Sequence, residues 1–85
     1  MPYIVKNKRA EILQKNQIVI KNIGTPGELN YAITMLCKAY LTDSSLCYDT
    51  INDILGALEG AKLEFYRRVA VPYESKKIKD SGDVY

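Results

Sequence analysis

The stretch that decides the fold is Thr25-Pro26-Gly27-Glu28 together with the apolar pattern that follows it. Threonine is a favoured N-cap residue, proline fits the first helical position, and a glutamate three residues after the cap completes a capping box. Beyond it, apolar residues recur at spacings of three and four, which a strand of period two cannot produce. They are Leu29, Ala32, Ile33, Leu36, Cys37, Tyr40 and Leu41. We therefore predict a helix over about 26–42, with this face in the core.

Helical patterns also lie on both sides of this segment. Upstream, the spacing of Ala10, Leu13, Gln17 and Ile20 predicts a helix over about 7–22, and we expect Gly24 to end it in the left-handed conformation. Downstream, a longer pattern predicts a helix over about 48–70. Its apolar positions are Ile51, Ile54, Leu55, Leu58, Ala61, Phe65 and Val69.

Proline at position 72 should stop or kink the long helix close to Val71, because its ring opposes the carbonyl four residues earlier. A short helix can restart there, or the chain can continue as a tail. The predicted fold class is all-α: one domain over residues 1–85, with three main helices and a short C-terminal helix or tail, and an oligomeric helical bundle as the assembly.

Composition narrows the class of protein. The 85 residues are 47% hydrophobic and 26% charged, as in an ordinary globular domain. No apolar run reaches the roughly 18 residues that a bilayer span needs, and the N-terminus lacks the pattern of a secretory signal. We expect a soluble, cytoplasmic protein without a membrane partner. The ends are basic and the middle is acidic, but a pI near 8.5 is too low to predict nonspecific binding to nucleic acid.

The residues for catalysis or metal binding are sparse. The chain has no histidine and two cysteines, so no zinc pattern exists, and no phosphate-binding glycine loop occurs. Asp49 and Asp53 share a helix face and read as a solvated acidic first turn. Cys37 reads as a small buried hydrophobe, and Cys47 as a loop or helix-start residue without a nearby base. We expect no enzymatic activity, no cofactor and no metal site.

One polar and aromatic cluster remains, in the second half of the long helix and just beyond it. Two interpretations stay open: a solvated face in which Glu64 pairs with Arg67 or Arg68, or an anion site in which arginines hold phosphate and a tyrosine stacks on a base. Asn30 and Tyr31 add donors near the start of the capped helix. The candidate ligand-binding residues are Arg67, Arg68, Tyr66, Lys62, Asn30, Tyr31 and Tyr73.

The helix lengths predict self-association. At 1.5 Å per residue the third helix outreaches its partners by about 9 Å, which leaves part of its apolar stripe uncovered. Gly56 and Gly60 lie within this helix and indicate either close packing inside the chain or a tight crossing between subunits. We expect a homo-oligomer, with a two-fold dimer as the commonest arrangement.

Four motifs carry a resemblance over most of the chain: residues 25–33, residues 61–68 (Ala-Lys-Leu-Glu-Phe-Tyr-Arg-Arg), Pro72-Tyr73-Glu74 and Gly82-Asp83-Val84-Tyr85. They resemble a family of short uncharacterised proteins encoded by phages and by bacterial and archaeal genomes. Residues 1–24 fit the family only loosely. The resemblance implies a phage setting and no mechanism.

These observations lead to two functional hypotheses. The first is a non-enzymatic, oligomeric protein that binds a small phosphorylated ligand, by analogy with compact phage proteins that sequester the nucleotide signals of host immunity. The ligand would then be held in the host cell cytoplasm. The alternative is a protein-interaction module that docks on a host or phage protein through the long helix, with the charges setting orientation.

Overall fold

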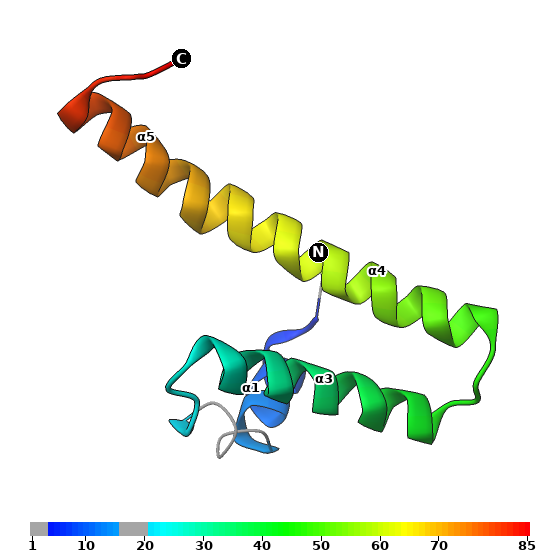
Figure 1. The fold of residues 1–85 in the computed structure, drawn as a ribbon. Helices are drawn as coiled ribbons and strands as arrows, with labels where there is room; N and C mark the ends of the chain where they lie inside the picture. Colours follow the sequence, from blue (N-terminus) through cyan, green and yellow to red (C-terminus); the bar gives the residue numbers. More distant parts are fainter. Residues whose placement is uncertain (1–3, 16–20) are drawn as a thin grey trace. The chain divides into compact units, whose positions relative to one another are not determined.

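The computed structural model describes residues 4–15 and 21–85, and within them every regular element is a helix. In chain order these are α1 (Lys6–Lys15), α3 (Pro26–Asp43), α4 (Tyr48–Phe65), the π-helix η1 (Tyr66–Ala70) and α5 (Val71–Ser81) (Figure 1). The predicted all-α class is confirmed. The part of the first predicted helix that contains Gln17, Val19 and Ile20 lies outside the described residues.

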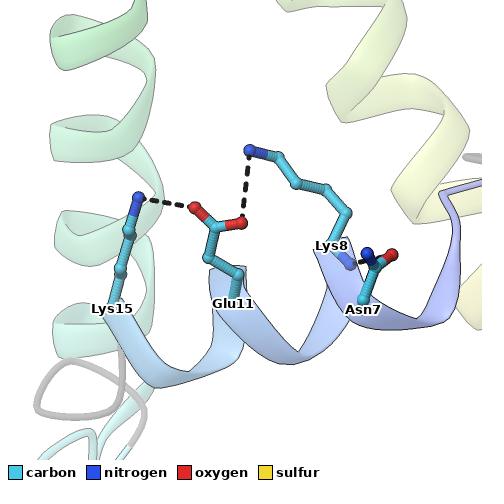
Figure 2. A network of polar contacts seen from close by, with 4 residues as sticks. All are labelled: Asn7, Lys8, Glu11 and Lys15. Atoms are coloured by element: carbon cyan, nitrogen blue, oxygen red, sulfur yellow. Dashed lines mark hydrogen bonds and ion pairs between the residues drawn. The ribbon is translucent and has the colours of Figure 1, made fainter.

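Helix α1 is stabilised by pairs of side chains on its surface. The Glu11 carboxylate lies 2.8 Å from the Lys15 ammonium and 3.7 Å from that of Lys8 (Figure 2). Asn7 Oδ1 accepts the Lys8 backbone N–H at 2.9 Å. Pairs at i, i+3 and i, i+4 each contribute a few tenths of a kcal/mol to the stability of a helix. They stabilise this mostly polar helix but do not determine which surface it packs on.

The capping motif that begins α3 is formed. Thr25 Oγ1 accepts the Glu28 backbone N–H at 3.1 Å, and Pro26 occupies the first helical position. Glu28 Oε1 accepts the backbone N–H of Gly24 at 2.7 Å, one residue before the one expected in a standard capping box. At the other end, the Ser44 N–H donates to the Tyr40 carbonyl at 3.1 Å.

The left-handed conformation predicted for Gly24 is wrong. Among the described residues, only Gly82 has a positive φ, of 88°. Gly24 instead presents its N–H to the Glu28 carboxylate, which belongs to the start of the next helix. The glycine with a positive φ instead lies at the end of α5, where the Gly82 N–H donates to the Ile78 carbonyl at 2.8 Å.

The long helix passes Pro72 without stopping. Helix α4, η1 and α5 follow one another without a break, so residues 48–81 form one continuous helical segment (Figure 1). The Val71 N–H donates to the Tyr66 carbonyl, five residues back, as in a π-helix. Because Pro72 has no N–H and its ring crowds the Arg68 carbonyl, a wider turn here accommodates the ring. The predicted stop or kink near Val71 is thus replaced by a π-helical turn.

The chain divides into two compact units, one up to Ile51 and one from Asn52 to Tyr85. Neither unit has a buried apolar side chain among the described residues. On the predicted core face of α3, Leu29, Ile33, Leu36 and Tyr40 are exposed, and Ala32, Cys37 and Leu41 are half-buried. Within its own unit this face is not buried, so the predicted burial requires a partner from outside that unit. No helix in residues 4–15 and 21–85 has the length and apolar character needed to cross a membrane.

Candidate functional site

The two adjacent arginines of η1 are joined by a single carboxylate. Glu64 Oε1 accepts from Arg67 Nη2, and Glu64 Oε2 accepts from Arg68 Nε at 3.1 Å. The arginine side chains are 67% and 74% exposed, whereas that of Glu64 is 27% exposed. These three residues and Tyr66 are called the arginine cluster below. The pairing of Glu64 with the arginines, one of the two interpretations of this cluster from the sequence, is present.

Pairing with Glu64 leaves much of the binding capacity of the arginines unused. A guanidinium has five N–H donors, and Glu64 engages one from each arginine. Two cations against one anion leave a net positive charge on the three residues. Exposed pairs of this kind contribute about 0–1 kcal/mol, so a phosphate group could replace the carboxylate at small cost. Glu64 also holds the two arginine side chains next to each other. Their rotamers are then restricted before a ligand binds, so binding would remove less conformational freedom.

A hollow of about 420 Å³ lies beside the arginine cluster. It is lined by Gly60, Leu63, Glu64, Tyr66 and Arg67. A Cβ added to Gly60 would have no heavy atom within 4 Å, and the same holds for Gly56. Neither glycine is therefore packed against another part of its own unit, residues 52–85. Gly60 instead opens the hollow, because any side chain there would project into it.

The glycines also lie on a different face from the apolar stripe of α4. Successive residues of an α-helix are separated by about 100°, which places Gly60 about 180° from Ile51 and about 140° from Phe65. A crossing of two helices at the glycines would therefore leave the apolar stripe uncovered. The two features, which the sequence analysis joined in one interface, belong to opposite sides of the helix.

The remaining candidate residues are not among those that line the hollow. The Lys62 ammonium lies 3.9 Å from the Glu59 carboxylate, and that of Lys77 lies 5.5 Å from the centre of the Tyr73 ring. Asn30 and Tyr31 belong to α3, in the other compact unit, and the Asn30 carbonyl accepts the Thr34 hydroxyl at 2.9 Å. Of the seven predicted residues, Arg67 and Arg68 share the Glu64 carboxylate, and Tyr66 and Arg67 line the same hollow.

The N-terminus of α3 already carries a negative charge. The Glu28 carboxylate lies at this end and accepts the Gly24 N–H, while the Glu28 N–H is bonded to Thr25. Asn30 and Tyr31 follow Glu28 by two and three residues along the helix. The anion site suggested for this helix start is therefore opposed by Glu28, and the arginine cluster is the stronger candidate.

A second feature lies at the start of α4, at Cys47, which the sequence predicted to be a loop or helix-start residue without a nearby base. The Cys47 carbonyl accepts the Ile51 N–H at 3.0 Å, so Cys47 occupies the helix start, as predicted. Its Sγ lies 3.4 Å from Thr50 Oγ1 and 3.8 Å from Ser45 Oγ. Hydrogen bonds from the Thr50 hydroxyl, the Thr50 N–H and the Ser45 hydroxyl lower the pKa of this thiol to about 7. The signal in the sequence was a cysteine three residues before a threonine at a helix start.

No group of three or more cysteine, aspartate or glutamate side chains is placed to hold a metal ion within residues 4–15 and 21–85. The described side chains do offer guanidinium groups at the arginine cluster and an exposed thiol at Cys47.

These features define a small, all-helical protein with an exposed, carboxylate-bridged pair of arginines. The chain belongs to a family described as a domain of unknown function, DUF6899, whose pattern matches residues 1–84. No curated protein and no solved structure matches the chain. The family membership agrees with the resemblance to an uncharacterised family.

Proposed function

We propose that this protein is a non-enzymatic binding protein that holds a small phosphorylated ligand, a nucleotide, at Tyr66, Arg67 and Arg68. The observation that carries the proposal is the pair of adjacent, largely exposed guanidinium groups held side by side by Glu64. Arginine can bind phosphate through two parallel N–H···O bonds, and two arginines can bind two faces of one phosphate or two successive phosphates.

The surroundings of the arginines suit the rest of a nucleotide. Tyr66 is 53% exposed and offers a ring on which a base can stack. The hollow beside it falls within the range of small-molecule sites, roughly 300–1,000 Å³, and Leu63 and Gly60 give it an apolar part. A site on one helix covers only one side of a ligand. Lys62, Tyr73, Asn30 and Tyr31 stay predicted as further ligand contacts.

The biological setting is part of the proposal and rests on the resemblance alone. A phage-encoded protein of this kind would sequester a nucleotide signal in the host cell cytoplasm, and binding without turnover would suffice for that task. Such a protein needs to bind the signal tightly, because it acts only by keeping the signal from its receptor. It does not need to position the signal for a reaction.

The proposal is tested on protein purified from cells, because a tightly held ligand co-purifies. Heat denaturation should release an ultraviolet-absorbing fraction from the wild type, identified by mass spectrometry. Arg67→Lys and Arg68→Lys should each reduce the amount released, since lysine cannot reproduce the bidentate geometry. Arg9→Lys on α1 is the matched control and should release as much as the wild type. Equal release from all four proteins would remove the arginine cluster from the site.

The alternative, a protein-interaction module, is favoured by a different observation. The long helix exposes large apolar side chains, among them Leu55 at 59% and Phe65 at 65%. Exposed apolar surface of this kind marks protein contacts. Under this alternative, heating would release no small molecule, and a host or phage protein would co-purify in fixed ratio with the wild type.

A further inference from the structure

Two lysines of α5 continue the positive surface of the arginine cluster. Lys76 and Lys79 follow Arg68 within the same compact unit, residues 52–85, and both are exposed. Among residues 4–15 and 21–85, neither lysine forms an ion pair. Their charges are therefore not balanced by a neighbouring carboxylate, whereas the charges of Arg67 and Arg68 are balanced in part by Glu64.

The geometry of the helix places these lysines on the side of Arg68. Successive residues turn by about 100° in an α-helix and by roughly 80° in a π-helix, where the hydrogen-bonded ring holds one more residue. Through η1 and into α5, this places Lys76 and Lys79 about 30° to either side of Arg68 around the axis. Lys77 lies about 130° from Arg68, and its ammonium lies 5.5 Å from the centre of the Tyr73 ring. We define the cation row as Arg67, Arg68, Lys76 and Lys79.

The positions along the axis indicate that the lysines would bind a second phosphate. At about 1.5 Å per residue, Lys76 lies about 12 Å beyond Arg68 and Lys79 about 16 Å beyond it. Arg68 Nε donates to Glu64, four residues back, so this guanidinium lies toward α4 and away from the lysines. The arginine and the lysines are therefore too far apart to hold one phosphate. In a stacked strand, phosphates follow each other about every 3.4 Å along the axis, so these distances correspond to a chain of a few nucleotides.

We propose that the ligand of this protein is a short single-stranded oligonucleotide, one phosphate of which lies at the arginine cluster and another at Lys76 and Lys79. The first phosphate is the one that the proposed function assigns to Arg67 and Arg68, so this inference rests on that function. Lysine binds phosphate as a point charge without a fixed orientation, which suits a flexible strand. Proteins that bind single strands combine cations along the backbone with aromatic rings on which bases stack, and Tyr66 offers such a ring beside the row.

The charges on either side of the cation row limit the length of the strand. Glu59 precedes the row in the chain, and Asp80 and Asp83 follow it. A long strand along the helix would approach these carboxylates, whereas a strand of a few nucleotides fits between them. The net charge of the whole chain, +2, is also too small to attract a long nucleic acid strongly. The row therefore suits a short strand.

The first test compares a ligand that can reach both ends of the cation row with one that cannot. The probes, titrated by calorimetry, are a 5′-phosphorylated DNA tetranucleotide of random sequence and an equimolar mixture of the four 5′-mononucleotides. The wild type should bind the tetranucleotide at least about tenfold more tightly, because the strand reaches the lysines as well as the arginines. Equal affinities for the two probes, both weakened by Arg67→Lys, would overturn this inference and leave the proposed function standing.

Two further outcomes of this titration would also overturn the inference. Inorganic tripolyphosphate serves as a third probe, and an affinity equal to that of the tetranucleotide would assign the row to a bare phosphate chain. Absence of binding by all three probes would contradict the proposed function as well.

The second test assigns the second phosphate to its lysines. Lys76→Ala and Lys79→Ala should each weaken binding of the tetranucleotide and leave binding of the mononucleotides unchanged. The slope of log affinity against log salt concentration should fall by about 0.7 for each phosphate contact that is lost. Lys77→Ala removes the same charge from another side of α5 and should change neither the affinity nor the slope. Equal effects of the three substitutions would indicate general charge attraction and would overturn the assignment of Lys76 and Lys79.

Discussion

Single residues show how a helix surface sets the chemistry of its side chains. Glu64 engages Arg67 and Arg68 because positions three and four residues apart lie next to each other on a helix. This pairing was predictable from spacing alone. The hollow at Gly60 was harder to predict, because the sequence does not show whether other side chains fill the space beside the glycine.

Alanine in place of either arginine should leave the fold almost unchanged. Both ion pairs with Glu64 are exposed, so Arg67→Ala and Arg68→Ala should each lower the free energy of unfolding by less than about 1 kcal/mol. Chemical denaturation measures this change. A loss of several kcal/mol from either variant would show that the pair stabilises the fold and would weaken its assignment to a ligand.

The reactivity of Cys47 should follow its lowered pKa. Because the thiolate is the reactive form, the rate of alkylation by iodoacetamide should rise with pH around a midpoint near 7. Thr50→Val removes the hydroxyl that contributes most to the shift and should move the midpoint upward, toward the ordinary value of 9.0. Ser45→Ala should move it in the same direction by less. An unchanged midpoint in Thr50→Val would contradict the hydrogen bond as the cause.

At the level of elements, the sequence predicted where helices form better than how they are joined. The capping motif and the apolar spacing placed one helix at 26–42, against Pro26–Asp43 in the structure, and the third at 48–70, which α4 and η1 together occupy. Propensity does not show how a helix accommodates proline at position 72, because the choice between a break and a π-turn depends on the geometry of the whole turn. Gly24 was misread because its partner belongs to the following helix.

The cap of α3 can be tested by one substitution. Thr25→Ala removes the oxygen that accepts the Glu28 N–H and should lower the free energy of unfolding by about 1 kcal/mol. The change should appear as a lower melting temperature. Thr42→Ala serves as a control in the last turn of the same helix, where the hydroxyl donates to the Lys38 carbonyl and caps no free N–H. Equal effects of the two substitutions would contradict a specific role for the cap.

The π-turn should depend on Pro72. In Pro72→Ala the new N–H can donate to the Arg68 carbonyl, which allows α-helical geometry through η1. Since proline in a helix interior costs up to about 3 kcal/mol relative to alanine, we expect a rise in melting temperature. The Val71 amide should also change its partner from Tyr66 to Arg67, which hydrogen exchange and NMR can follow. A lower melting temperature would contradict this account of the turn.

For the whole molecule, an apolar pattern identifies a face without identifying what covers it. The stripes of α3 and the long helix were read correctly as apolar, yet no apolar side chain among the described residues is buried. Spacing along one helix carries no information about its partner, whether α3, a second copy or another protein. The same holds for the candidate site. Tyr66, Arg67 and Arg68 could be predicted together because they are adjacent in the chain, whereas residues that would complete the site depend on tertiary or quaternary structure.

The most direct test of the central claim, that this protein binds a phosphorylated ligand, is native mass spectrometry of the protein purified from cells without denaturation. We predict a mass that exceeds a multiple of 9.6 kDa by the mass of a small phosphorylated molecule. The excess should disappear on heating and be smaller in Arg67→Lys. A wild-type mass equal to the bare chain or to a bare multiple of it, with no excess before heating, would contradict the claim.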